Sequence, residues 1–234
     1  MPDKKMLVGK ISFDIIGRWS LWFLAIYLVI YFGTGAFMTW WGDDIMTWSF
    51  LENSRGSARI YFFIAGILSM GGLIRYYVSN GVTRRDYFFG TMGAAVILAA
   101  LLTVVFGAAY GLETMAAAFT GWTQSQSGST LNLPGQLLSS FFQFILYYAI
   151  GWFISASFFR FHWFVGLLLT FVGGGLMGVI ELFWEAENSI FQFISVMASG
   201  GVSLMVSVLL STLLFLLLAA VIRMLTKRAD IKAV

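Results

Sequence analysis

Residues 79–112 read SNGVTRRDYFFGTMGAAVILAALLTVVFGAAYGL, a short polar segment followed by a long apolar run. No residue from Tyr87 to Leu112 is charged. A helix needs about 20 mostly apolar residues to cross the hydrocarbon core of a bilayer. This run therefore predicts a membrane-spanning helix, and the polar segment before it, with Arg84 and Arg85, is expected at the membrane surface.

The composition of the whole chain indicates the same class. Of the 234 residues, 59% are hydrophobic and 11% are charged, and the mean hydropathy is +0.86. Soluble domains carry roughly 25% charged residues. The net charge of +3 is small, and the basic residues of the chain are spread over loops, so no nucleic-acid partner is expected. The chain has no cysteine, which excludes disulfides and thiolate metal sites.

Apolar runs long enough to span a bilayer occur six times. Their approximate bounds are 19–41, 60–78, 87–112, 137–159, 162–184 and 201–223. The runs are continuous and do not alternate as the strands of a membrane barrel would. No signal-peptide cleavage pattern precedes the first run, so we expect that run to be retained as a span. The sequence predicts an all-α integral membrane protein with six transmembrane helices in a single transmembrane domain over residues 1–234.

The basic residues predict the orientation of these spans. Twelve of the fourteen fall in the N-terminal stretch, around the 79–86 loop, in the turn at Arg160 or near the C-terminus, and Arg55 and Arg59 fall on the other side. Cytoplasmic loops are enriched in Lys and Arg, so both termini are expected to be cytoplasmic. Tryptophans are expected to anchor the interfaces, with Trp19 and Trp163 inside and Trp40, Trp41 and Trp184 outside.

Residues 4–18 predict an amphipathic helix on the inner membrane surface, before the first span. Leu7, Val8, Ile11 and Ile15 form one helical stripe, with charged residues beside it. A merely polar leader is the alternative interpretation.

The 79–88 loop has its own local signals. Asn80-Gly81 favours a turn, and Thr83 followed by Asp86 is a variant of the capping box, so a helix is expected to start there and run into the third span. Arg84 and Arg85 in its first turn oppose the helix dipole, so helix stability does not explain them. Two interpretations stay open: a topology signal that also meets anionic lipid, or a docking helix for a cytoplasmic partner.

Other polar residues near the spans predict no catalytic centre. Glu181 and Glu185 share a helical face, as a metal or proton site would need, but with no second ligand cluster in the sequence we favour two charges at the outer interface. His162, the only histidine, lies in a turn, where an interfacial role is expected. The sequence has no G-x-S-x-G, H-E-x-x-H or phosphate-loop motif, so we do not expect an enzyme.

Two further features concern packing and the outer surface. Gly107-x-x-x-Gly111 and Gly174-x-x-x-Gly178 permit close helix contact, within one subunit or at a dimer seam. Residues 113–136 predict a polar outer loop. Residues 189–198 are apolar but too short to span, which predicts a helix packed at the outer face.

With these features the chain resembles the membrane subunits of ABC exporters of the type-2 (ABC-2-like) permease class. The match lies in six spans with both ends inside, a preceding surface helix, an outer apolar segment between the last two spans, and the 79–88 loop. The loop residues that carry it are Gly81, Val82, Thr83, Arg84, Arg85, Asp86, Tyr87 and Phe88.

The resemblance implies that this loop couples to a separate ABC-type ATPase subunit. ATP and magnesium would then be bound by that partner, with no cofactor in this chain. A second permease copy, in a homodimer or a related heterodimer, would complete a path for hydrophobic or amphipathic cargo such as a peptide, an antibiotic or a lipid. The location implied is a bacterial plasma membrane, with membrane lipid around the spans.

Two alternatives from other classes remain. One is the substrate-capture subunit of a vitamin importer, which docks its partner through small-residue surfaces on its spans. The other is a membrane immunity or assembly protein that binds a partner without moving cargo.

Overall fold

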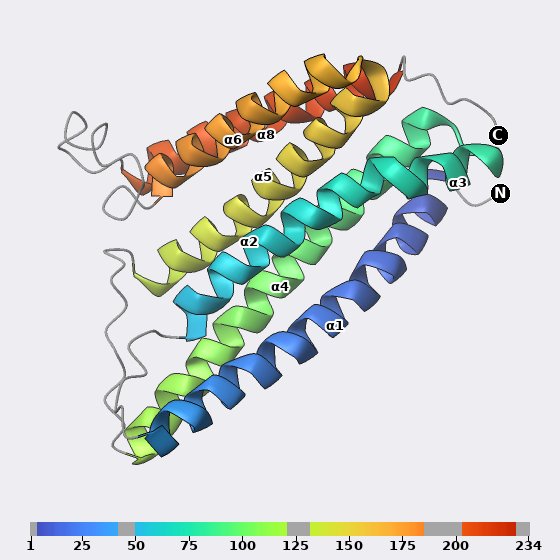
Figure 1. Ribbon diagram of the computed structural model, residues 1–234. Helices are drawn as coiled ribbons and strands as arrows, with labels where there is room; N and C mark the ends of the chain where they lie inside the picture. The colour runs from blue at the N-terminus through green and yellow to red at the C-terminus, as the bar shows by residue number, and fades with distance from the viewer. Residues whose placement is uncertain (1–3, 42–49, 121–131, 185–202, 228–234) are drawn as a thin grey trace.

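The computed structural model describes residues 4–41, 50–120, 132–184 and 203–227, and within these ranges the chain is helical, with no strand (Figure 1). The elements are α1 Lys4–Trp41, α2 Phe50–Leu68, the π-helix η1 Ser69–Leu73, α3 Ile74–Ser79, α4 Arg84–Thr120, α5 Leu133–Arg160, α6 Trp163–Trp184 and α8 Leu204–Lys227. Among the described residues, six segments are long and apolar enough to cross a membrane. The all-α fold with six candidate spans is therefore confirmed.

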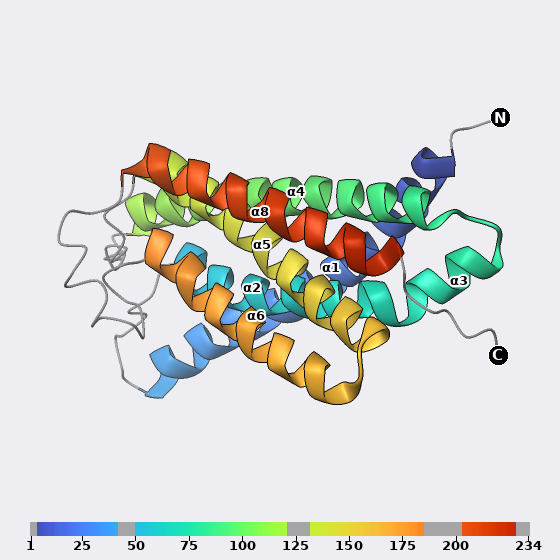
Figure 2. The ribbon, with the colours of Figure 1, turned by 90° about the horizontal axis from the view of Figure 1, so that it is seen from above.

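Helix α5 occupies the middle of the bundle. It lies between α2 and α4 on one side and α6 and α8 on the other (Figures 1 and 2). It is also the most deeply buried candidate span, although it carries several Ser and Gln residues. Two of these polar groups bond within the helix, since Ser140 Oγ donates to the Gln136 carbonyl at 2.8 Å and Gln143 Nε2 donates to Ser139 Oγ at 3.1 Å. Polar side chains in a membrane protein are expected to face its interior, and α5 follows that rule.

Helices α2 and α5 cross closely through one glycine on each helix. A Cβ at Gly66 would collide with the carbonyl oxygen of Tyr148, and a Cβ at Gly151 would collide with that of Phe63. Small residues let helix backbones approach in this way. Neither glycine belongs to the two G-x-x-x-G pairs. Of those, a Cβ added at Gly107 would lie 3.0 Å from the side chain of Leu137 in α5, whereas one at Gly174 would meet nothing within 4 Å.

The expected surface helix over residues 4–18 is not a separate element. Helix α1 runs without a break from Lys4 to Trp41, about 57 Å at 1.5 Å per residue. Val8, Ser12 and Ile16 are buried, and a Cβ at Gly90 of α4 would lie 2.9 Å from the Gly9 nitrogen. The prediction of a separate surface helix was wrong because the segment is the first part of a longer helix whose Val8 packs against Gly90 of α4. Its apolar stripe is divided, since Val8 is buried whereas Leu7 is 48% exposed.

Helix α2 begins ten residues before the expected span at 60–78, so Arg55 and Arg59 lie in a helix and not in a loop. The π-helix η1 interrupts this span at Gly71 and Gly72. Helix α4 extends to Thr120, so the first part of the expected loop 113–136 is helical. The expected outer helix at 189–198 and Glu185 lie outside the described residues.

The basic residues gather at one end of the bundle. The start of α1, the short α3 and the ends of α5 and α8 lie together there (Figures 1 and 2). This end carries Lys4, Lys5, Lys10, Arg75, Arg84, Arg85, Arg160, Arg223 and Lys227. We call it the basic end. Its assignment to the cytoplasm remains a prediction of the positive-inside rule.

Candidate functional site

The turn between α3 and α4 is short and has a hydrogen-bonded cap on both sides. Gly81 has φ 75°, the left-handed conformation that suits glycine. The Val82 nitrogen donates to the Tyr77 carbonyl at 3.0 Å, and the Gly81 nitrogen donates to the Val78 carbonyl at 3.0 Å. These two bonds are the pattern of a Schellman motif, which closes the C-terminus of α3.

Thr83 closes the other side of the turn as the N-cap of α4. Its Oγ1 accepts from the Asp86 nitrogen at 3.1 Å and donates to Asp86 Oδ2 at 2.8 Å. The carboxylate also lies in the first turn, where the helix dipole favours a negative charge. The predicted cap is confirmed, and with the Schellman motif it fixes the path of the chain through this turn.

The two aromatic residues of the predicted loop lie in the core. Tyr87 is fully buried, and its hydroxyl donates to the Ser69 carbonyl in η1. Phe88 is 4% exposed, and its ring centroid lies 5.5 Å from that of Trp152 in α5. These side chains connect the turn to η1 and to the central helix, so within the predicted loop the surface available to a partner is limited to residues 79–86.

Three arginines hold the end of α8 against the rest of the basic end. Arg84 Nη1 donates to the Lys227 carbonyl at 3.1 Å, and Arg223 Nη1 donates to the Arg84 carbonyl at 3.3 Å. Arg160, at the end of α5, donates to the Met224 carbonyl at 2.9 Å. Cations are favourable at a helix C-terminus, where backbone carbonyls lack partners within the helix.

This arrangement explains Arg84. Its side chain opposes the dipole of its own helix but satisfies the end of α8, a contact that the local sequence could not reveal. The side chain of Arg85 is exposed. The α3–α4 turn with Arg84, Arg85, Arg223 and the end of α8 is called the basic latch below.

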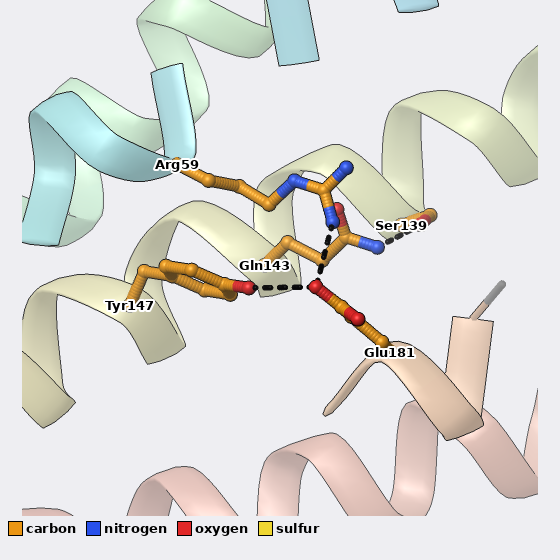
Figure 3. Close-up of polar contacts among 5 residues, drawn as sticks. All are labelled: Arg59, Ser139, Gln143, Tyr147 and Glu181. Atoms are coloured by element: carbon orange, nitrogen blue, oxygen red, sulfur yellow. Dashed lines mark hydrogen bonds and ion pairs between the residues drawn. The ribbon is translucent and has the colours of Figure 1, made fainter. Parts of the chain in front are cut away.

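A second polar cluster joins α2, α5 and α6 (Figure 3). Glu181 of α6 lies between α2 and α5, with its Oε1 3.9 Å from Arg59 Nη1 and 3.3 Å from the Tyr147 hydroxyl, which donates to it. The side chains of Arg59 and Glu181 are 14% and 26% exposed. Glu181 is therefore directed at partners inside the bundle, whereas the sequence favoured an outer interface charge.

Sequence analysis missed this Arg59–Glu181–Tyr147 cluster because Arg59 was placed in a loop. One signal was present: Arg55 and Arg59 lie one helical turn apart, directly before an apolar run. Within the described residues, no three His, Asp or Glu side chains lie close enough together to hold a metal ion. The cluster therefore offers a partly buried ion pair with a hydroxyl donor, an arrangement that can hold helices together or bind a polar group.

Three other sequence features have clear positions. His162 is exposed in the turn between α5 and α6. Trp163 is 64% exposed, as expected of an interfacial anchor, but Trp184 is 8% exposed and its Nε1 donates to Ser211 Oγ of α8 at 3.0 Å. The expected outer anchor at Trp184 is wrong, because its polar indole nitrogen is satisfied within the bundle.

Comparisons with protein-family models, with curated proteins and with solved structures found no match to this chain.

Proposed function

We propose that this chain is the membrane subunit of an ATP-driven exporter, which forms part of a path for hydrophobic or amphipathic cargo. A separate ABC-type ATPase, which binds ATP and magnesium, docks at the basic latch. A second permease copy completes the path in a bacterial plasma membrane.

The observation that carries this proposal is the connection of the α3–α4 turn to the rest of the bundle. The turn exposes Arg85 at the basic end, while Arg84 and Arg223 attach it to the end of α8. Behind it, Tyr87 bonds to η1, where Ser69 Oγ also lies 2.7 Å from the Tyr148 hydroxyl of α5. A force applied to such a turn reaches three helices through side chains that are already in contact.

The π-helix supports the proposal further. Segments of π-helix are rare in proteins as a whole, but those that do occur are often found at functional sites. Here η1 lies between the turn and the central helix, and its carbonyl at Ser69 accepts the Tyr87 hydroxyl. A movement of the start of α4 would change this contact first.

The basic latch suits an acidic groove on a partner. Arginine recognises carboxylates through a planar, two-pronged hydrogen-bonding surface. The side chain of Arg85 is exposed, whereas that of Arg84 donates to the Lys227 carbonyl of α8. We therefore expect Arg85 to contact the ATPase and Arg84 to position the turn.

The experiment is purification of the tagged chain from its native membranes, followed by reconstitution of the complex and measurement of ATP turnover. We expect an ABC-type ATPase to co-purify, and Arg85→Gln to reduce its yield about tenfold, the scale set by loss of a charge-assisted hydrogen bond. Arg18→Gln, an exposed arginine of α1, is the matched control. Wild-type ATPase recovery with Arg85→Gln would remove the latch from the coupling role.

One observation favours the substrate-capture alternative. Gly174 and Gly175 are exposed side by side on α6, with open space where a side chain would lie. A partner helix packed on this surface would suit a capture subunit. In that case Gly174→Leu would reduce partner recovery and Arg85→Gln would not.

A further inference from the structure

A groove runs between α1 and α4 near the basic end, with a volume of about 650 Å³. It exists because the two helices approach at Gly9 and Gly90 and then leave a floor without side chains at Gly93, where an added Cβ would meet nothing within 4 Å. The walls are apolar and include Phe13, Phe89 and Ile97.

The charged residues that line this groove are both basic. Lys5 and Lys10 of α1 both line it. The sole acidic residue in the described part of α1, Asp14, is exposed and is not among the lining residues. The groove therefore combines two ammonium groups with an apolar interior.

The position of the groove along the bundle suits a lipid. The α4 residues that line it, 89–97, begin two residues into the charge-free run at Tyr87. The interior of the groove thus borders the start of the hydrocarbon layer. Lysine side chains near helix ends extend toward the headgroups, where phosphate lies.

We propose that this groove binds an anionic phospholipid. Lys5 and Lys10 hold its phosphate and headgroup, and one acyl chain lies along Phe13, Gly93 and Ile97. A zwitterionic lipid has no net charge to match the two ammonium groups, so the site selects for anionic lipid. The site is independent of the exporter proposal.

The test uses the full chain in vesicles of phosphatidylcholine with trace spin-labelled phosphatidylglycerol or spin-labelled phosphatidylcholine. The motionally restricted lipid fraction gives the relative association of the two labels. We expect a preference for phosphatidylglycerol that falls about fivefold or more in Lys5→Gln with Lys10→Gln, since each basic residue near an anionic headgroup contributes measurably to binding. Arg18→Gln with Lys227→Gln removes the same charge elsewhere and should keep the preference.

Gly93→Leu tests the groove itself, because the added side chain fills the floor without removing charge. The matched control is Gly111→Leu, on the same helix and also with open space at the Cβ position. We expect Gly93→Leu to lose the preference and Gly111→Leu to keep it, with circular dichroism and elution volume unchanged in both. Equal association of the two labels in the wild type, an unchanged preference in Gly93→Leu, or equal loss in the charge control would each overturn the proposal.

Discussion

Arg223, near the end of α8, donates a hydrogen bond from Nη1 to the backbone oxygen of Arg84, the first residue of α4, at 3.3 Å. Arg84 in turn donates to the carbonyl of Lys227, four residues beyond Arg223. The two arginines thus cross-connect two helix ends that are 139 residues apart in sequence. Each arginine donates to a backbone carbonyl of the other helix, and neither pairs with a carboxylate in these bonds.

The two arginines of the turn should differ in their effect on stability. Arg84→Gln removes the hydrogen bond to the end of α8 and should lower the free energy of unfolding by about 1 kcal/mol. This value is near the lower end of the range for hydrogen bonds from charged donors, because the side chain is partly exposed. That corresponds to a fall of about 2–4 °C in the melting temperature of a chain of this size. Arg85→Gln should leave the melting temperature unchanged. Thermal unfolding in detergent, followed by tryptophan fluorescence, checks both, and equal shifts would contradict the distinction.

Thr83 should matter through its side-chain oxygen. Thr83→Ala removes the acceptor for the Asp86 nitrogen and should lower the free energy of unfolding by about 1 kcal/mol. Thr83→Ser keeps the side-chain oxygen and should retain most of that stability. Hydrogen exchange at residues 84–87 measures the effect locally. Faster exchange in the alanine variant alone is expected, and unchanged exchange would show that the cap does not hold the start of α4.

The Arg59–Glu181 pair should be coupled energetically. Removing one charge leaves the other partly buried, which costs about 3–5 kcal/mol in a fully buried pair and about 1–2 kcal/mol here, where both side chains keep some exposure. Arg59→Met combined with Glu181→Gln should therefore be less destabilising than the sum of the single variants. A double-mutant cycle measured by thermal unfolding tests this, and additive effects would show that the two residues do not interact.

The glycine crossing of α2 and α5 should tolerate no side chain. Gly151→Ala places a methyl group against the backbone of α2, which cannot rotate away, so the cost should reach the upper part of the range for overpacking, about 3 kcal/mol or more. Gly174→Ala adds the same group in open space and should be neutral or slightly stabilising. Fluorescence-detected size-exclusion chromatography after heating compares the two, and similar profiles would contradict the close contact.

The predicted orientation can be tested with single cysteines, because the native chain has none. Ser79 ends α3 at the basic end, and Leu133 starts α5 at the opposite end; both are exposed. In intact cells an impermeant maleimide should label Leu133→Cys and should label Ser79→Cys only after the cells are opened. The reverse pattern would place the basic latch outside the cell, away from any ATPase.

The local features of the chain were predictable because they depend on neighbours in sequence. An apolar run of about 20 residues is sufficient to predict a span, and the Thr83–Asp86 cap involves two residues three positions apart. The predicted boundaries at 137–159 and 162–184 lie within four residues of the ends of α5 and α6. The basic end also followed from sequence, since alternating spans bring the same set of helix ends together.

Three features were decided only by tertiary structure. Residues 4–18 were compatible with a separate surface helix or with the start of a longer packed helix, and the close approach of Val8 and Gly9 to Gly90 decided for the longer helix. Glu181 meets Arg59 across 122 positions, and Arg84 meets Lys227 across 143, distances over which no periodicity or capping pattern carries information. Hydropathy and caps are local properties of the chain, whereas the partner of a buried charge or a bare glycine depends on which helix faces it.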